Sequence, residues 1–173
     1  METMTEPSAG ELVLTRLLDA PRSLVWKAWT DPVHFVRWFG PTSVAVKNCV
    51  IDPRPGGVIR FSHESADGNL KVHVSGVFEE VVEPQRLAMR LGFVDGEDKP
   101  AAPAMVADWP VHARLLTIVT LEERGTKTLL TVEQRVVPPE AAGLAAVQKE
   151  RRLAREGWAE TLDRLDRVVT GRQ

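Results

Sequence analysis

Residues 153–170 read LAREGWAETLDRLDRVVT, and this stretch decides the fold that the sequence predicts. Its large apolar side chains recur at steps of four, three and four: Trp158, Leu162, Leu165 and Val169. This spacing places them on one face of a helix, which we expect to begin after Pro139 and to end at Gly171. A long helix with a single apolar face needs an apolar surface to cover.

The sequence before this helix predicts strands. Alternating apolar and polar residues separated by turn-forming Gly, Pro, Asp and Asn occur over 43–52, 58–64, 70–83, 86–94, 112–123 and 126–136. A further strand is expected over 11–19. Short turns between consecutive strands imply an antiparallel sheet, here of six to seven strands.

Two short helices are expected between the first strand and the second. Pro21 opens the first, because proline at the first helical position loses no hydrogen bond, and this helix ends at Thr30. Asp31 caps the second, which Gly40 and the proline after it close. The whole order predicts an α+β fold in which a curved sheet wraps around the long C-terminal helix and leaves space between them.

Composition places the chain among globular proteins of one domain. Of its 173 residues, 43% are hydrophobic and 27% are charged. The single cysteine, Cys49, excludes an intrachain disulfide framework and a cysteine-based zinc cluster. A net charge of −2 argues against a uniformly basic nucleic-acid binder, and no apolar run is long enough for membrane insertion. We expect a flexible tail over residues 1–10, whose polar character is unlike a signal peptide, and one cytoplasmic domain over 11–171.

Several local motifs resemble one known family. They are Ala20-Pro21 with Val25-Trp26, Trp29-Thr30-Asp31-Pro32, Trp38, the turn at 52–57, Gly76–Glu80 before Pro84, and Gly157-Trp158. Together they resemble the AHSA branch, named for the activator of the heat-shock protein 90 ATPase, of the START/Bet v 1-like (SRPBCC) superfamily. The resemblance implies the helix-grip fold with a cavity between sheet and helix, and it transfers no shared catalytic motif. Relatives in the superfamily bind lipids, steroids or polyketides, and some act as cyclases or dehydratases.

The function predicted on this basis is the binding of a small hydrophobic ligand in the internal cavity. We expect these residues to line it: Trp29, Phe61, His63, Met89, Trp109, Gln134, Trp158 and Leu162. Phe61 and His63 share a strand face, and Trp109 lies in the long segment 95–110, where it would act as a lid. For the tryptophans the alternative is core packing, and for His63 a side chain satisfied by a neighbouring backbone group. Arg90 enters the cavity only if Leu87 and Met89 face outward.

Two other functions use the same residues differently. An enzyme of the polyketide cyclase/dehydratase type would polarise its substrate with His63 or His112. An interaction module would regulate a chaperone, or form a homodimer, through exposed Trp109 and Trp38. No cofactor and no metal are expected, since no two of the four histidines have the i, i+4 spacing of a helical metal site.

Overall fold

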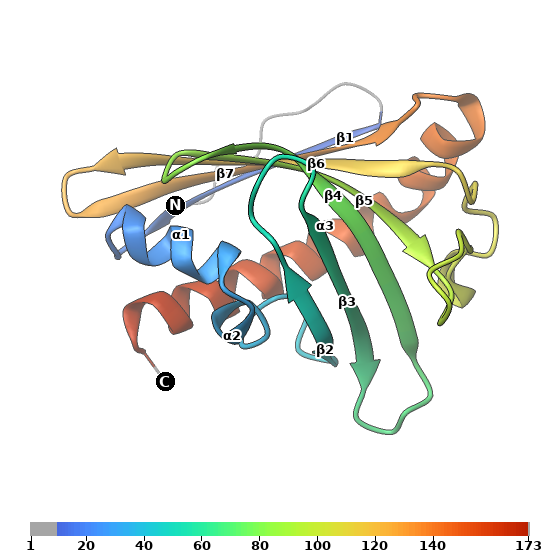
Figure 1. The fold of residues 1–173 in the computed structure, drawn as a ribbon, viewed down its shortest axis with the longest axis horizontal. Coiled ribbons are helices and arrows are strands. Elements are labelled where there is room, and N and C mark those ends of the chain that lie inside the picture. Colours follow the sequence, from blue (N-terminus) through green and yellow to red (C-terminus); the bar gives the residue numbers. More distant parts are fainter. Residues whose placement is uncertain (1–9, 173) are drawn as a thin grey trace.

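The fold is one antiparallel sheet of seven strands curled around a long helix (Figure 1), and the computed structural model describes residues 10–172. The strands are β1 (Glu11–Leu18), β2 (Val44–Ile51), β3 (Val58–Ser65), β4 (Lys71–Val82), β5 (Arg86–Val94), β6 (Arg114–Arg124) and β7 (Lys127–Val137). Their order in the sheet is β1-β7-β6-β5-β4-β3-β2. The predicted α+β helix-grip architecture is therefore confirmed, with the larger of the two strand numbers.

The helix α3 (Ala141–Thr170) crosses the concave face of the sheet (Figure 1). Its 30 residues give a length of about 45 Å. Leu162, Leu165 and Val169 are buried, as their spacing predicts. The helix ends at Gly171, whose φ of 68° lies in the left-handed region that glycine adopts without steric penalty.

The two short helices lie at one end of the concave face, beside the C-terminal half of α3 (Figure 1). They are α1 (Arg22–Thr30) and α2 (Pro32–Phe35). The Asp31 side chain accepts a hydrogen bond from the Val33 amide at 2.9 Å and so caps α2 as predicted. Trp38, just after α2, is fully buried, and its Nε1 donates to the Ala28 carbonyl oxygen at 2.9 Å. This bond fixes the chain after α2 against α1.

The segment between β5 and β6 folds back onto the first half of α3. It contains a short 3₁₀ helix, η1 (Ala104–Val106), and it carries Trp109 into a small apolar cluster with Ala113, Val136 and Ala146. The Trp109 ring packs edge-on against Phe93, with 5.4 Å between ring centroids. The segment between β5 and β6 therefore forms, together with α3, part of the layer that covers the sheet.

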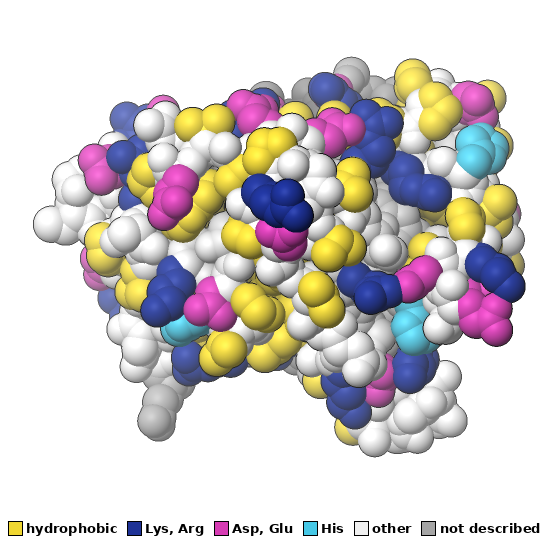
Figure 2. Space-filling view, in the orientation of Figure 1, with side chains coloured by type: hydrophobic (Ala, Val, Ile, Leu, Met, Phe, Trp, Pro, Cys, Tyr) yellow, Lys and Arg dark blue, Asp and Glu magenta, His cyan; other side chains and the backbone are white. Residues whose placement is uncertain are grey.

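The surface carries charges of both signs, interspersed with hydrophobic side chains on the face shown in Figure 2. Among residues 10–172, no helix is both long enough and apolar enough to cross a membrane. The tail predicted over 1–10 lies outside the described residues except for Gly10.

Candidate functional site

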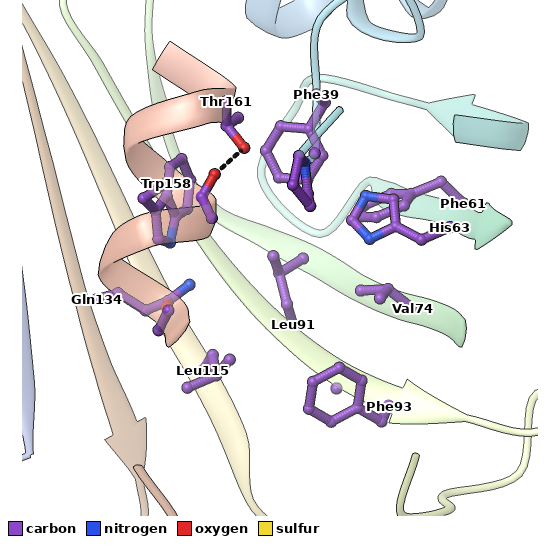
Figure 3. Close-up of a pocket in the computed structure, with 15 residues that line it drawn as sticks. Phe39, Phe61, His63, Val74, Leu91, Phe93, Leu115, Gln134, Trp158 and Thr161 are labelled. Carbon is purple, nitrogen blue, oxygen red and sulfur yellow. Dashed lines mark hydrogen bonds between the residues drawn. The ribbon is translucent and has the colours of Figure 1, made fainter. Parts of the chain in front are cut away.

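A cavity of about 240 Å³ lies between α3 and the strands β3 to β7 (Figure 3). Aromatic and aliphatic side chains form most of its wall: Phe39, Phe61, Val74, Leu91, Phe93, Leu115, Ala154 and Trp158. The backbone or side chains of Gly40, Pro41, His63, Gly92, Gln134, Gly157 and Thr161 complete it. An apolar hollow with few polar groups is the usual form of a small-molecule site.

The hollow exists because α3 carries small residues where it faces the middle of the sheet. Ala154 and Gly157 line the cavity, one turn apart. A Cβ added to Gly157 would meet no atom within 4 Å, so this position opens onto empty space. The Thr161 hydroxyl donates a hydrogen bond to the Gly157 carbonyl oxygen at 2.6 Å (Figure 3). This bond occupies the hydroxyl proton, so Thr161 has no donor left for a ligand.

Aromatic rings form the end of the cavity nearest α2. Phe39 contacts Phe61 and Trp158 edge-on, with ring centroids 5.2 Å and 5.8 Å apart. Behind this wall, Trp29 stacks on Trp158 at 6.4 Å. Trp29 therefore supports the lining from the core and does not itself form the surface of the cavity.

His63 is the polar group of this end. Strand alternation puts it on the same face of β3 as Phe61, and its ring stacks on Phe39 with centroids 5.8 Å apart (Figure 3). Its Nε2 is buried and has no hydrogen-bond partner among residues 10–172, contrary to the alternative of a backbone-satisfied histidine. Burial, and secondly the positive charge of Arg164, lower the pKa of His63 to about 4. The imidazole is consequently neutral at pH 7.

Two side chains of α3 hold the rim of the cavity in place. Arg164 Nη1 donates to the carbonyl oxygens of Gly40 and Pro41 at 2.8 Å and 3.1 Å. Glu160 accepts hydrogen bonds from the amide and the hydroxyl of Thr42 at 3.0 Å and 2.9 Å, which lower the pKa of its carboxyl group. The turn between α2 and β2 is thereby attached to the helix that it faces.

A second cavity of about 140 Å³ continues from the first toward the start of α3. The two cavities share four wall residues: Phe93, Leu115, Gln134 and Ala154. Trp109, Val106, Ala146 and Val147 close the far side of the second cavity, and Arg151 lies at its edge. Gln134, between the cavities, donates its Nε2 to Thr117 Oγ1 at 3.0 Å.

The structure brings five of the eight predicted residues to a cavity wall. Phe61, His63, Gln134 and Trp158 line the first cavity, and Trp109 lines the second. Trp29, Met89 and Leu162 are at most 2% exposed and belong to the core. Ligand contact by any of the eight stays a prediction.

Arg90, His112 and the pair Trp38 and Trp109 all lie outside the wall of the first cavity. Arg90 is exposed and donates to Glu79 at 2.5 Å, so Leu87 and Met89 face inward and Arg90 does not enter the cavity. His112 lies at the surface, with Nε2 2.9 Å from a carboxylate oxygen of Glu140. The expectation of an interaction surface made by exposed Trp38 and Trp109 is wrong, since they are 0% and 7% exposed.

Several wall residues were not predicted from the sequence: Phe39, Val74, Leu91, Phe93, Gly157 and Thr161. One signal was available for Gly157, which interrupts the apolar face of a long helix, where glycine is unfavourable unless space is needed. Within residues 10–172, no three His, Cys, Asp or Glu side chains converge as metal ligands would.

Comparisons with known proteins agree with this architecture. The sequence model of the family described as "Activator of Hsp90 ATPase homolog 1-like protein" matches residues 19–170. A search of curated proteins gave no match.

Solved structures with the same fold cover nearly the whole chain. A crystal structure of a Nitrosomonas europaea protein has a TM-score of 0.74 at 25% identity, covering 96% of this chain and 97% of that one. A solution structure from Arthrobacter aurescens has a TM-score of 0.81 at 22% identity, with 98% and 91% covered. The AHSA1 protein of Silicibacter pomeroyi has a TM-score of 0.70 at 19% identity, with 94% and 99% covered.

Proposed function

Because this chain belongs to the family of Activator of Hsp90 ATPase homolog 1-like proteins, we propose that it uses the cavity between its sheet and α3 to bind a small hydrophobic ligand. The observation that carries the proposal is an apolar hollow of about 240 Å³ with one buried polar atom, His63 Nε2, left without a partner. Buried polar groups are normally hydrogen-bonded, so an unpaired one on a side chain that lines a cavity supports a partner supplied by a ligand.

The apolar wall supplies the affinity. Each 100 Å² of apolar ligand surface removed from water contributes about 2.5 kcal/mol before the entropy of binding is subtracted. A ligand with rings or an aliphatic chain matches the aromatic end formed by Phe39, Phe61 and Trp158. The rim held by Arg164 keeps this surface formed before the ligand arrives.

His63 supplies orientation. A neutral imidazole has one ring nitrogen that accepts a hydrogen bond and one that donates. A ligand hydroxyl or carbonyl group next to Nε2 would satisfy this atom, and a wholly apolar ligand would leave it unpaired. The site therefore favours a ligand with one polar group in an otherwise apolar body.

The test is titration with the neutral fluorescent dye N-phenyl-1-naphthylamine. We expect saturable binding to the unaltered protein, and loss of binding in Gly157→Leu, whose side chain would fill the hollow. The matched control is Gln148→Leu, which adds the same side chain to an exposed position of the same helix. Native mass spectrometry of the purified protein would show whether a molecule is already bound.

Absence of dye binding, together with native masses equal to that of the bare chain, would overturn the proposal. Equal dye affinity in Gly157→Leu and Gln148→Leu would also overturn it, because the dye would then bind elsewhere.

A further inference from the structure

The second cavity contains two nitrogen atoms that have no hydrogen-bond partner. Trp109 Nε1 and Arg151 Nε are both buried, and both side chains line this cavity. Within residues 10–172, neither atom meets an acceptor. Both are donors only, so their partner has to be an acceptor such as a carbonyl or carboxylate oxygen.

Side chains of both charges line this edge of the cavity: Glu11, Arg135, Glu150 and Arg151. Arg135 lies 3.9 Å from a carboxylate oxygen of Glu11, and Arg151 Nη2 donates to the Glu11 backbone oxygen at 3.3 Å. Glu150 also lines the cavity, so acidic and basic side chains balance around its edge. A ligand ammonium group would leave Trp109 Nε1 and Arg151 Nε unpaired, because an ammonium group cannot accept a hydrogen bond.

The two cavities lie in series along one helix. Their α3 residues run from Ala146 to Thr161, a distance of about 22 Å at the helical rise. Phe93, Leu115, Gln134 and Ala154 form the wall common to both. A side-chain movement there would join the hollows into one path. Its middle is apolar except for Gln134, whose amide is already bonded to Thr117. Unpaired polar atoms belong to residues at each end, Trp109 and Arg151 at one and His63 at the other.

We propose that the two cavities together bind one elongated amphiphile that is polar at both ends. Its carboxylate or carbonyl oxygen is held by Trp109 and Arg151, its chain passes Phe93, and its second polar group, a hydroxyl or carbonyl, meets His63. This proposal rests on the proposed function and specifies the class of its ligand.

The first experiment measures displacement of N-phenyl-1-naphthylamine from the unaltered protein by hexanoate, palmitate, ω-hydroxypalmitate and hexadecylamine. We expect palmitate to displace the dye at lower concentration than hexanoate, and ω-hydroxypalmitate at a lower concentration still. Hexadecylamine should be at least about tenfold weaker than palmitate, the loss expected when donors face a donor.

The second experiment separates the donors from the shape of the cavity. Trp109→Phe keeps a ring but removes the N–H group, and it should weaken palmitate about three- to tenfold more than it weakens the dye. Trp26→Phe is the matched control, since Trp26 is equally buried, at 7% exposure, in α1. Arg151→Met should act like Trp109→Phe, with Arg152→Met on the exposed face of α3 as its control.

The comparison of hexadecylamine with palmitate uses the unaltered protein. It therefore tests the proposal even if Trp109→Phe fails to fold. Equal displacement by palmitate and hexadecylamine, or by hexanoate and palmitate, would overturn the two-ended ligand. If the dye still bound and still responded to Gly157→Leu, the proposed function would stand without it. A protein that binds neither dye nor acid refutes both.

Discussion

Arg164 donates a hydrogen bond to the carbonyl oxygen of Gly40 across 2.8 Å, and so connects the C-terminal half of α3 to the rim of the first cavity. The same guanidinium reaches Pro41 at 3.1 Å and lowers the pKa of the neighbouring His63. Arg164 thus couples the attachment of the rim to the protonation state of His63. Among residues 10–172, His63 is the only histidine that lines the first cavity.

Replacement of Arg164 by Met should therefore have two effects at once. The free energy of unfolding should fall by about 2 kcal/mol, because charged hydrogen bonds to partly buried carbonyl groups are lost. The pKa of His63 should rise from about 4, since a nearby positive charge is removed. Denaturant titration and NMR titration of the imidazole measure these effects. Arg167→Met, exposed on the same helix, is the control, and an unchanged His63 pKa in Arg164→Met would contradict the coupling.

Stability should depend on pH through His63. In the unfolded chain its pKa is near 6.5, whereas in the folded protein burial and Arg164 lower it to about 4. Between these values the unfolded state binds more protons, so this contribution is fully present above pH 6.5 and is lost as the pH falls toward 4. The loss is on the order of 3 kcal/mol.

The measurement for this prediction is the free energy of unfolding at pH 7 and at pH 4 in parallel samples. His63→Phe should lose less stability than the unaltered protein over that interval, while His112→Phe, at the surface, should behave like the unaltered protein. Identical losses in all three proteins would show that His63 does not contribute.

Two glycines of α3 should respond oppositely to alanine. A Cβ at Gly157 meets nothing within 4 Å, so Gly157→Ala should stabilise the protein by about 0.5–1 kcal/mol through helix propensity. At Gly143 the added Cβ would lie 2.9 Å from a methyl group of Val136, so the same change should gain nothing or destabilise. Thermal unfolding of both variants checks the difference, and a gain at Gly143 as large as at Gly157 would contradict it.

Gly76 permits the close approach of β4 and β5. A Cβ at this position would overlap the carbonyl oxygen of Arg90, which is a backbone atom and cannot turn aside. Gly76→Ala should lower the free energy of unfolding by about 1–3 kcal/mol, the usual range for overpacking. Ser75→Ala in the same strand is the control, and denaturant titration is the measurement. A Gly76→Ala protein as stable as Ser75→Ala would show that the strands separate without penalty.

Cys49 should react slowly with thiol reagents in the folded protein. Burial raises its pKa to about 11, so little thiolate is present at pH 8. The rate of reaction with a disulfide reagent should increase in guanidinium chloride, where the thiol regains its ordinary pKa. A folded protein that reacts as fast as the unfolded one would contradict the burial of this side chain.

The sequence predicted the elements well because each leaves a periodic pattern. The strand expected over 86–94 is observed as Arg86–Val94, and the apolar face of α3 is buried as its spacing indicated. Alternation along a strand gives the face on which a side chain lies, but not its depth beneath the helices. Met89 and Phe93 share a face of β5, yet Met89 is covered in the core while Phe93 forms the wall between the cavities.

The parts that the sequence could not predict depend on contacts between distant segments. Trp109 lies in a stretch with no periodicity, and its burial follows from packing against Phe93 and the first turns of α3. The attachment of Gly40 to Arg164 likewise joins residues more than a hundred positions apart. Neither contact leaves a local pattern in the sequence. The rim of the first cavity and the wall of the second could therefore be identified only from the structure.

The position of β1 at the edge of the sheet constrains how this chain can fold during its synthesis. Of the seven strands, β1 leaves the ribosome first, but among residues 10–172 its only neighbour in the sheet is β7, with Leu18 opposite Thr128. The six strands from β2 to β7 can pair in the order in which they emerge, whereas β1 waits for the last of them. Leu12 and Leu14, buried in the finished protein, remain accessible to chaperones until that strand and α3 have been made.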